Sequence, residues 1–244
     1  MSTPLIAFDE IDSTNAEARR RADAGENGPV WFTAARQTAG RGRRGRAWET
    51  GQGNLAATLL ITTDRPPADA AQLSFVAALA VCDFARAYLS ADKVKVKWPN
   101  DVMVGADKVS GILLESGRRS DGRLWVAVGV GINLAHHPHD TERPATSFAA
   151  HMAGPSPDPA LAMAGLASAF DDWLAVWARQ PFAAIVDAWT ARAYGLGQPA
   201  TARLPSETVH GIAEGLDADG SLRLKAADGS IRRITAGDVF FGDA

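Results

Sequence analysis

Cysteine is almost absent from this chain of 244 residues, which contains a single one, Cys82. One cysteine cannot form an internal disulfide, and it excludes the zinc and iron–sulfur sites that need several thiolate ligands. No stretch approaches the roughly 18 apolar residues that a membrane-spanning helix needs. The first residues also lack the basic start and apolar core of a secretory signal peptide. These absences predict a soluble, cytoplasmic protein that does not bind membranes.

A large net charge is missing as well. The formal net charge is −3, with 46% hydrophobic and 22% charged residues. This is an ordinary globular composition, which excludes wholesale disorder and a collagen-like fibre. The charge also argues against a protein that is basic overall and coats nucleic acid, although local patches remain open. The length fits one large domain, or a main domain with a small second one.

The apolar pattern predicts an α+β main body, a mixed and largely antiparallel sheet backed by helices, over residues 1–195. Thr14 and Glu17 form the capping-box pattern of a helix start. Beyond residue 195 only short strands with turn signals follow, which predicts a small β-barrel over residues 196–244. Strands are expected at 4–8, 30–36, 54–63, 94–98, 102–104, 109–116 and 124–133, and helices at 12–25, 70–89, 160–179 and 182–193.

The most unusual segment is an arginine-rich loop, in which five arginines fall within residues 36–46. Its glycines let the backbone approach a ligand closely, and arginine binds phosphate in a bidentate manner. The loop therefore suits a nucleotide triphosphate, although a solvated basic loop has about equal weight from charge alone. Nucleic-acid binding is disfavoured by the acidic total charge and by the lack of aromatic residues in the loop. The chain has no Walker A pattern, so an ATP site here is not a P-loop.

Three further segments combine polar residues or glycines with β-strand patterns. The sequence KWPND at 97–101 lies between two predicted strands, where Asn and Asp commonly form only a turn. The strand KVSGILLE at 108–115 begins with a lysine beside a glycine, which can present a cation to a pocket. Alternate glycines in VGVGIN at 128–133 either mark bulges or clear one strand face for a flat ligand. The third glycine of a dinucleotide fingerprint is missing.

In this order, the motifs resemble one family, the biotin protein ligases (biotin–[acetyl-CoA-carboxylase] ligases). The family pattern runs S-T-N, GRGRxGRxW, K-W-P-N-D, K-x-x-G-I-L-x-E and G-x-G-x-N, matched here at 13–15, 40–48, 97–101, 108–115 and 129–133. The resemblance implies a class II synthetase-like catalytic domain with an SH3-like C-terminal domain. It implies formation of biotinyl-5′-AMP from biotin and ATP with Mg²⁺, and then transfer of biotin to a lysine of a biotin carboxyl carrier protein.

The resemblance also implies roles for individual residues. Lys108, Arg43 and Asp101 are expected to be catalytic, with Lys108 acting electrostatically and Asp101 holding Mg²⁺ or accepting the proton of the acceptor lysine. The residues expected to contact biotin are Ser13, Thr14, Asn15, Gln37, Gly40, Arg41, Arg43, Trp48, Lys108, Gly111 and Gly129. Those expected to contact the nucleotide are Arg41, Arg43, Arg44, Arg46, Trp48, Asn100, Lys108, Gly131, Ile132 and Asn133, the last of which would recognise adenine.

Two other functions remain open, a lipoate–protein ligase of related fold and a non-catalytic nucleic-acid-binding protein that uses the arginine-rich loop. Only twelve residues precede Ser13, too few for the helix-turn-helix that some biotin ligases carry. The sequence therefore predicts a monofunctional ligase that does not bind DNA. A homodimer through an exposed sheet edge remains open. We expect Cys82 to be a core residue, His136, His137 and His139 to lie in a surface loop, and Trp173, Trp177 and Trp189 to pack between helices.

The arginine-rich loop has almost no apolar anchors between residues 38 and 47. We therefore expect it to be mobile without ligand and to become ordered over the adenylate.

Overall fold

The main body of the protein is built on one seven-stranded sheet. A computed structural model describes residues 3–139 and 141–242. The strand order is β1-β2-β3-β7-β6-β5-β4. β1 and β2 run parallel, and the other neighbouring strands are antiparallel. The predicted mixed, largely antiparallel sheet is therefore confirmed. The strands are β1 (Leu5–Ile11), β2 (Val30–Gln37), β3 (Leu55–Thr63), β4 (Val94–Lys97), β5 (Asp101–Val104), β6 (Asp107–Arg118) and β7 (Leu124–Ile132).

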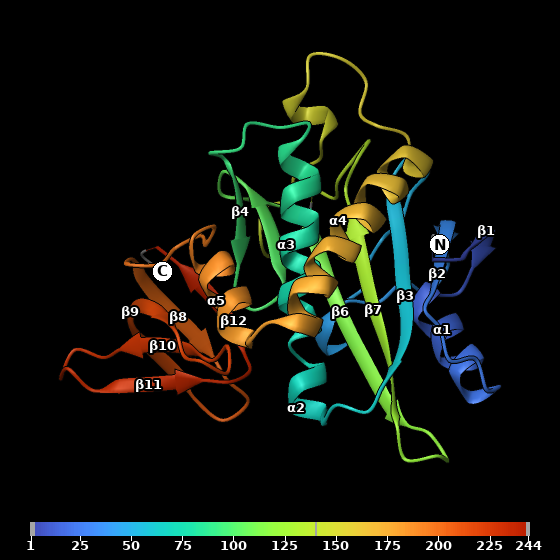
Figure 1. The fold of residues 1–244 in the computed structure, drawn as a ribbon. Coiled ribbons are helices and arrows are strands. Elements are labelled where there is room, and N and C mark those ends of the chain that lie inside the picture. The colour runs from blue at the N-terminus through green and yellow to red at the C-terminus, as the bar shows by residue number, and fades with distance from the viewer. Residues whose placement is uncertain (1–2, 140, 243–244) are drawn as a thin grey trace.

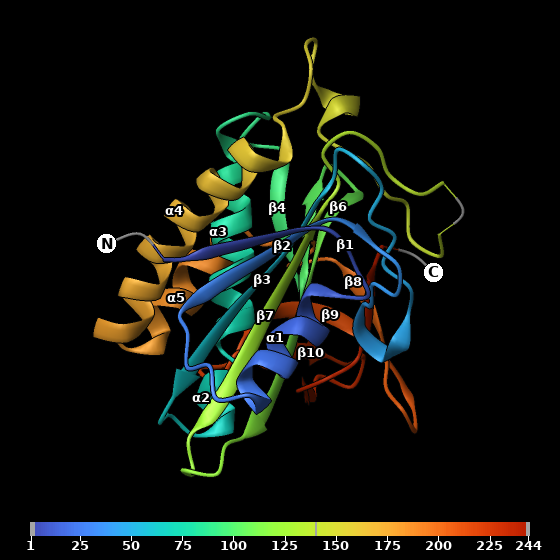
Figure 2. The same cartoon turned by 90° about the vertical axis from the view of Figure 1, so that its right-hand side faces the viewer.

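Helices cover both faces of this sheet. α3 (Leu73–Arg86) packs on one face, and α4 (Pro159–Arg179) and α5 (Phe182–Thr190) pack against α3. The opposite face carries α1 (Thr14–Asp23), as the turned view shows (Figure 1, Figure 2). Most of the stability of such helices comes from burial of their apolar faces against the sheet and against one another.

The two faces of β7 have different neighbours because successive side chains of a strand point to opposite sides. Val128 and Val130 belong to the larger core under α3. Ala127 belongs to a smaller core on the α1 side. Gly129 and Gly131 follow on that same side and leave it without side chains. The sequence thus fixes which face of the sheet is filled and which is open.

The capping box predicted at the start of α1 does not form. Ser13, and not Thr14, is the N-cap residue, and its side chain makes no capping hydrogen bond. The Thr14 hydroxyl donates instead to Oε1 of Gln37 (3.1 Å), and the Glu17 carboxylate pairs with Arg20 and Arg21. A tertiary partner for Thr14 and ion pairs within the helix for Glu17 therefore replace the capping box.

The single helix predicted over 70–89 is two helices, α2 (Pro67–Ala70) and α3, separated by a turn. The segment Pro67–Arg86 is long and apolar enough to cross a membrane, but about two thirds of it is buried inside the protein. It is the core helix of this fold. Cys82 lies on it with no exposed surface, as predicted.

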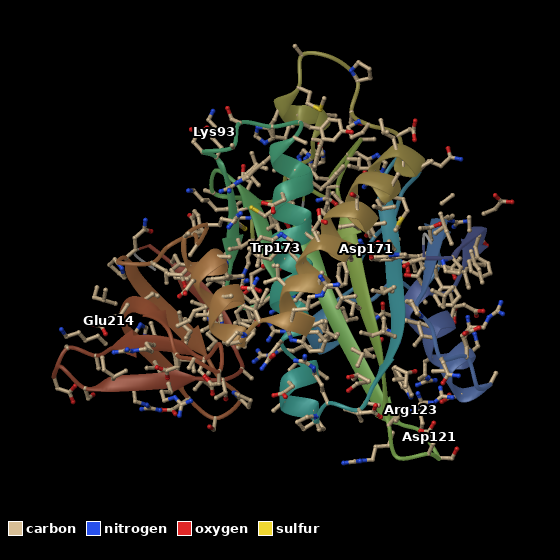
Figure 3. All side chains as sticks on the ribbon, in the orientation of Figure 1. Lys93, Asp121, Arg123, Asp171, Trp173 and Glu214 are labelled. Carbon is tan, nitrogen blue, oxygen red and sulfur yellow. The ribbon has the colours of Figure 1, made fainter. Side chains whose placement is uncertain are left out.

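Three tryptophans predicted to pack between helices do so. Trp189 and Trp177 are buried. Trp173 on α4 is partly buried, and its Nε1 donates to Oδ2 of Asp83 on α3 at 2.8 Å (Figure 3).

The C-terminal segment forms a second, five-stranded antiparallel sheet in the order β11-β10-β9-β8-β12. Within the described part of the chain the two edge strands, β11 and β12, are not paired with each other. Over these described residues the sheet is therefore open and does not close into a barrel. Trp98 joins the two sheets, because its Nε1 donates to the carbonyl of Gly220 at 3.0 Å. The strands are β8 (Pro199–Arg203), β9 (Thr208–Leu216), β10 (Leu222–Lys225), β11 (Ile231–Ile234) and β12 (Asp238–Phe241).

Candidate active site

One cavity of about 380 Å³ collects residues from all five sequence motifs. Its lining includes Thr14 and Asn15 of α1 and Gly129 and Gly131 of β7, so it lies on the side of the sheet that carries α1. A volume of this size is typical of a small-molecule site. Motif residues that line it are Ser13, Thr14, Asn15, Arg41, Arg43, Arg46, Trp48, Asn100, Asp101, Lys108, Gly111, Gly129, Gly131 and Asn133, and Gln37 lines it as well.

The first part of the cavity is lined by neutral hydrogen-bonding side chains at the start of α1, which are held by partners around them. Gln37 accepts from the backbone N–H of Thr14 (2.8 Å) and donates through Nε2 to the Thr50 hydroxyl (3.0 Å). Asn15 donates to Oε2 of Glu115 (2.9 Å) and accepts from a threonine hydroxyl on β3 (2.7 Å). Thr14 and Asn15 are both at most 5% exposed. Fixed donors and acceptors of this kind suit a small polar, uncharged group.

The middle of the cavity has a floor made of glycines. Gly111 on β6 lies directly across from Gly131 on β7 in the strand register. A Cβ atom at Gly131 would overlap the Trp48 indole, and one at Gly129 would overlap the Asn15 amide. Only residues without a side chain let Trp48 and Asn15 lie against the sheet. The predicted clearing of one strand face is therefore present, and Trp48 lies over it.

The far part of the cavity is cationic. The Lys108 ammonium lies 2.6 Å from Oδ1 of Asp101 and 5.5 Å from the centre of the Trp48 ring. The other carboxylate oxygen of Asp101 is 3.4 Å from Nη1 of Arg143. Nη1 of Arg43 donates to Oδ1 of Asn100 at 2.9 Å. Both lysine and arginine donors are thus held at one end of the site, where they can stabilise an anion.

Two predicted site residues lie elsewhere. The Ile132 side chain is fully buried in the core on the α3 face. The side-chain alternation that brings Gly131 and Asn133 to the cavity takes the Ile132 side chain away from it. A nucleotide could therefore contact Ile132 only through its backbone. Gly40 does not line the cavity, because it packs against the Trp48 backbone and accepts a hydrogen bond from its N–H (3.0 Å).

Asn133 and Arg44, two predicted nucleotide contacts, have partners within the protein. Nδ2 of Asn133 donates to the carbonyl of Thr146 at 3.0 Å, so the amide nitrogen holds the loop that follows β7. The remaining Oδ1 is the part that could face a ligand. Arg44 points away from the cavity and pairs with Asp238 of the C-terminal sheet at 3.1 Å.

Arg143 and Asp238 line the cavity but were not found from the sequence. Arg143 is a single arginine in a surface loop, and Asp238 lies in the other sheet. Neither position carries a local pattern, because both enter the site only through the packing of distant segments. The one feature of the sequence that could have indicated Arg143 is its place directly before Pro144.

Lys97 is a buried cation beside this cationic end. It is 6% exposed, and burial, reinforced by the positive charge of Arg143, lowers the pKa of its ammonium to about 8. The carboxylate of Asp101 opposes this shift only in part. The KWPND turn therefore places one lysine behind the site and Asp101 within it.

The cavity does not provide a protein-only metal site. Among the residues that the structure describes, no three His, Cys, Asp or Glu side chains are grouped to hold an ion. Both oxygens of Asp101 already face cations, Lys108 and Arg143. Mg²⁺ usually binds through one or two carboxylates, waters and substrate phosphates, so the residues present fit an ion that arrives with a nucleotide.

Comparison with known proteins shows the family of the chain. The model of the Biotin/lipoate A/B protein ligase family matches residues 6–133. The chain therefore belongs to this family of ligases. The model of the Biotin protein ligase C terminal domain matches residues 195–242, which places the chain among the biotin protein ligases.

Individual relatives span nearly the whole chain. The biotin--[acetyl-CoA-carboxylase] ligase of Paracoccus denitrificans is 44% identical over 237 residues, which cover 95% of this chain and 98% of that protein. The bifunctional ligase/repressor BirA of Bacillus subtilis is 30% identical, covering 99% of this chain and 75% of its own length. The structure of biotin protein ligase from Aquifex aeolicus in complex with biotin and ATP has a TM-score of 0.81 and 26% identity, with 99% of each chain covered.

Proposed function

We propose that this protein is an ATP-dependent biotin protein ligase that forms biotinyl-5′-AMP and transfers biotin to a lysine of a biotin carboxyl carrier domain. The observation that carries the proposal is the joining of all five motifs in one cavity with three different parts. The neutral network near Thr14 and Gln37 suits the ureido ring of biotin, and the glycine floor suits its apolar chain. The cationic end suits a carboxylate beside a triphosphate.

In the first step an oxygen of the biotin carboxylate attacks the α-phosphorus of ATP. The bond between the α-phosphorus and the bridging oxygen breaks, and pyrophosphate leaves. The two reactants repel each other because both are anionic, so fixed cations must bring them together. Of the cations that line the cavity, Lys108 and Arg43 are our candidates for this purpose, and Mg²⁺ would enter bound to the phosphates.

In the second step the amine of the acceptor lysine attacks the biotinyl carbonyl carbon. The bond from that carbon to the AMP oxygen breaks, an amide forms, and the amine loses a proton. A free lysine has a pKa of about 10.4, so the acceptor needs a group that takes this proton. Asp101 is our candidate, because it is the motif carboxylate of the KWPND turn that faces the cationic end.

The partner follows from this activity. We propose a biotin carboxyl carrier protein of acetyl-CoA carboxylase or a related carboxylase, since the Paracoccus relative is named for that substrate. We also propose that the enzyme works in the cytoplasm and does not bind operator DNA. A homodimer remains a prediction, for which the edge strand β1, with Leu5 51% exposed, is the natural surface.

Pyrophosphate release with ATP tests the proposal. We expect release with biotin and not with lipoate, no effect of added DNA, and transfer of label to a purified biotin carrier domain. Release with lipoate alone would favour the lipoate ligase. Binding of DNA without any release would favour the nucleic-acid-binding alternative.

A further inference from the structure

A carboxylate of the C-terminal sheet holds the arginine-rich loop of the catalytic part. Asp238 begins β12, and its side chain is only 6% exposed. Its Oδ2 lies 2.6 Å from Nη2 of Arg46 and 3.1 Å from Nη1 of Arg44. Its Oδ1 lies 4.0 Å from Nη2 of Arg143. Three cations from two catalytic-domain loops therefore surround one anion from the other sheet.

Backbone carbonyls next to this carboxylate add to the attachment. Nη2 of Arg43 donates to the carbonyl of Gly237 at 2.9 Å. Nη2 of Arg44 lies 3.5 Å from the carbonyl of Arg203 on β8. The loop is thus attached to the C-terminal sheet at three positions, by Arg43, Arg44 and Arg46.

The other side-chain contacts of the loop are also polar. They are the hydrogen bond from Arg43 to Asn100 and two longer ion pairs, Arg41 with Glu115 at 3.5 Å and Arg46 with Glu142 at 3.6 Å. Residues 41–47 are exposed or half-buried, and none is buried. Their attachment is made of hydrogen bonds and ion pairs, because the segment has no large apolar side chain before Trp48. Without a central anion the clustered guanidinium groups would repel one another.

The ionisation of Asp238 agrees with its place in this cluster. Burial opposes the charged form, but the hydrogen bond from Arg46 and the charges of Arg44 and Arg143 outweigh it. Together they lower the pKa of the Asp238 carboxyl below its ordinary value.

The sequence predicts a mobile loop because it has almost no apolar anchors, but the ion pairs described above are anchors of another kind. We propose that Asp238 is a positioning residue that holds the arginine-rich loop, residues 38–47, against the cavity before any substrate binds. Through this carboxylate the C-terminal sheet fixes the position of the loop beside the cavity. A loop already in place loses less freedom when ATP binds, so the loss of Asp238 weakens ATP binding more than it slows the chemical step. The effect on ATP rests on the proposed function, whereas the order of the loop does not.

Limited digestion with trypsin measures the order of the loop directly, because trypsin cleaves after arginine. We expect Asp238→Asn to speed cleavage after Arg41 about tenfold without ligand, which corresponds to losing one charge-assisted hydrogen bond. The KM for ATP in pyrophosphate release should rise by a similar factor, with kcat changed less. Asp238→Glu should restore part of both properties. Asp217→Asn, which removes an ion pair of the same sheet with Arg233, is the matched control and should change neither.

Two results would overturn the proposal. One is cleavage of Asp238→Asn at the wild-type rate, and the other is a lower KM for ATP, which would mean that the carboxylate competes with the phosphates. Should Asp238→Asn fail to fold, Arg46→Gln breaks the same pair from the loop, and wild-type cleavage after Arg41 in that variant overturns the proposal equally. If the wild-type protein releases no pyrophosphate, the ligase proposal fails, but the trypsin result still decides the role of Asp238.

Discussion

At the scale of single residues, Lys108 has the clearest chemical position. Its ammonium lies between Asp101 at 2.6 Å and the Trp48 ring, at the cationic end of the cavity. We predict that Lys108→Ala lowers the rate of biotinyl-AMP formation by at least about 100-fold, the usual loss when one preorganised charge is removed. Lys93→Ala, an exposed lysine near β4 (Figure 3), is the control. Near-normal adenylation by Lys108→Ala would refute the role.

A substitution of Asp101 can show in which of the two reaction steps this carboxylate acts. Asp101→Asn keeps the shape of the side chain but removes its charge. If Asp101 accepts the proton of the acceptor lysine, transfer to the carrier domain slows more than adenylation does. Single-turnover rates of the two steps, measured separately with isolated biotinyl-AMP, give the ratio. A larger loss in adenylation would favour a metal-binding role instead.

Lys97 predicts a dependence of stability on pH. The pKa of Lys97 is about 8 in the folded protein, against the ordinary 10.5. Below pH 8 the lysine is therefore protonated in both the folded and the unfolded protein, and the folded protein is destabilised by the buried charge. Between about 8 and 10.5 only the unfolded chain is protonated, and stability from this group rises with pH. Lys97→Met should raise the unfolding free energy at pH 7 by about 3 kcal/mol, the equivalent of 2.5 pH units, and by less as pH rises.

Urea unfolding at pH 7 and pH 9.5 measures this difference. Lys93→Met, made at an exposed position of the same region, should bring no comparable gain. A gain for Lys97→Met that is equal at both pH values would contradict the burial of a charge.

At this scale the sequence indicated the motif residues but not their partners. Lys108, Asp101 and Arg43 could be predicted because short patterns carry them. Arg143 and Asp238 could not, since each reaches the cavity only after segments far apart in the chain have packed together.

At the scale of elements, the glycines of strand β7 leave the space that the cavity occupies. We predict that Gly131→Ala reduces biotin affinity at least tenfold, because the added Cβ occupies the place of the Trp48 indole. Isothermal titration calorimetry measures the affinity. Gly154→Ala adds a Cβ in open space and should bind biotin normally. Unchanged affinity in Gly131→Ala would show that the glycine floor is not part of the biotin site.

Element types were predictable where apolar periodicity is strong. The strands β3 and β7 and the helix α4 were predicted within one or two residues. Errors arose where tertiary partners overrode local signals, as at the Thr14 capping box. The direction of the Ile132 side chain does not follow from the motif as a whole, because alternate residues of a strand face opposite sides.

At the scale of the whole molecule, the two sheets are joined through the KWPND turn. Trp98 donates to the carbonyl of Gly220 in the C-terminal sheet, while Asn100 and Asp101 of the same turn face the cavity. The sequence predicted both parts of the chain, but it could not show that one turn contacts both. Composition carries no information on contacts between distant segments.

We predict that Trp98→Phe lowers the unfolding free energy by about 1 kcal/mol, because it leaves the Gly220 carbonyl without its donor. It should also speed trypsin cleavage in the arginine-rich loop, since the sheet that carries Asp238 is held less firmly. Trp177→Phe is the matched control, because it removes a similar hydrogen bond, to Gln72 at 2.8 Å, away from the C-terminal sheet. Equal loop cleavage in the two variants would contradict the link between the sheets.

The indole of Trp48 has a consequence for how this protein can be observed. Of the seven tryptophans in the chain, it is the one that lines the cavity. A ligand entering over Gly131 must cover or displace this ring, which changes the polarity around it. The protein therefore carries its own optical reporter, and the intrinsic emission of the unlabelled enzyme should follow each substrate as it arrives and departs.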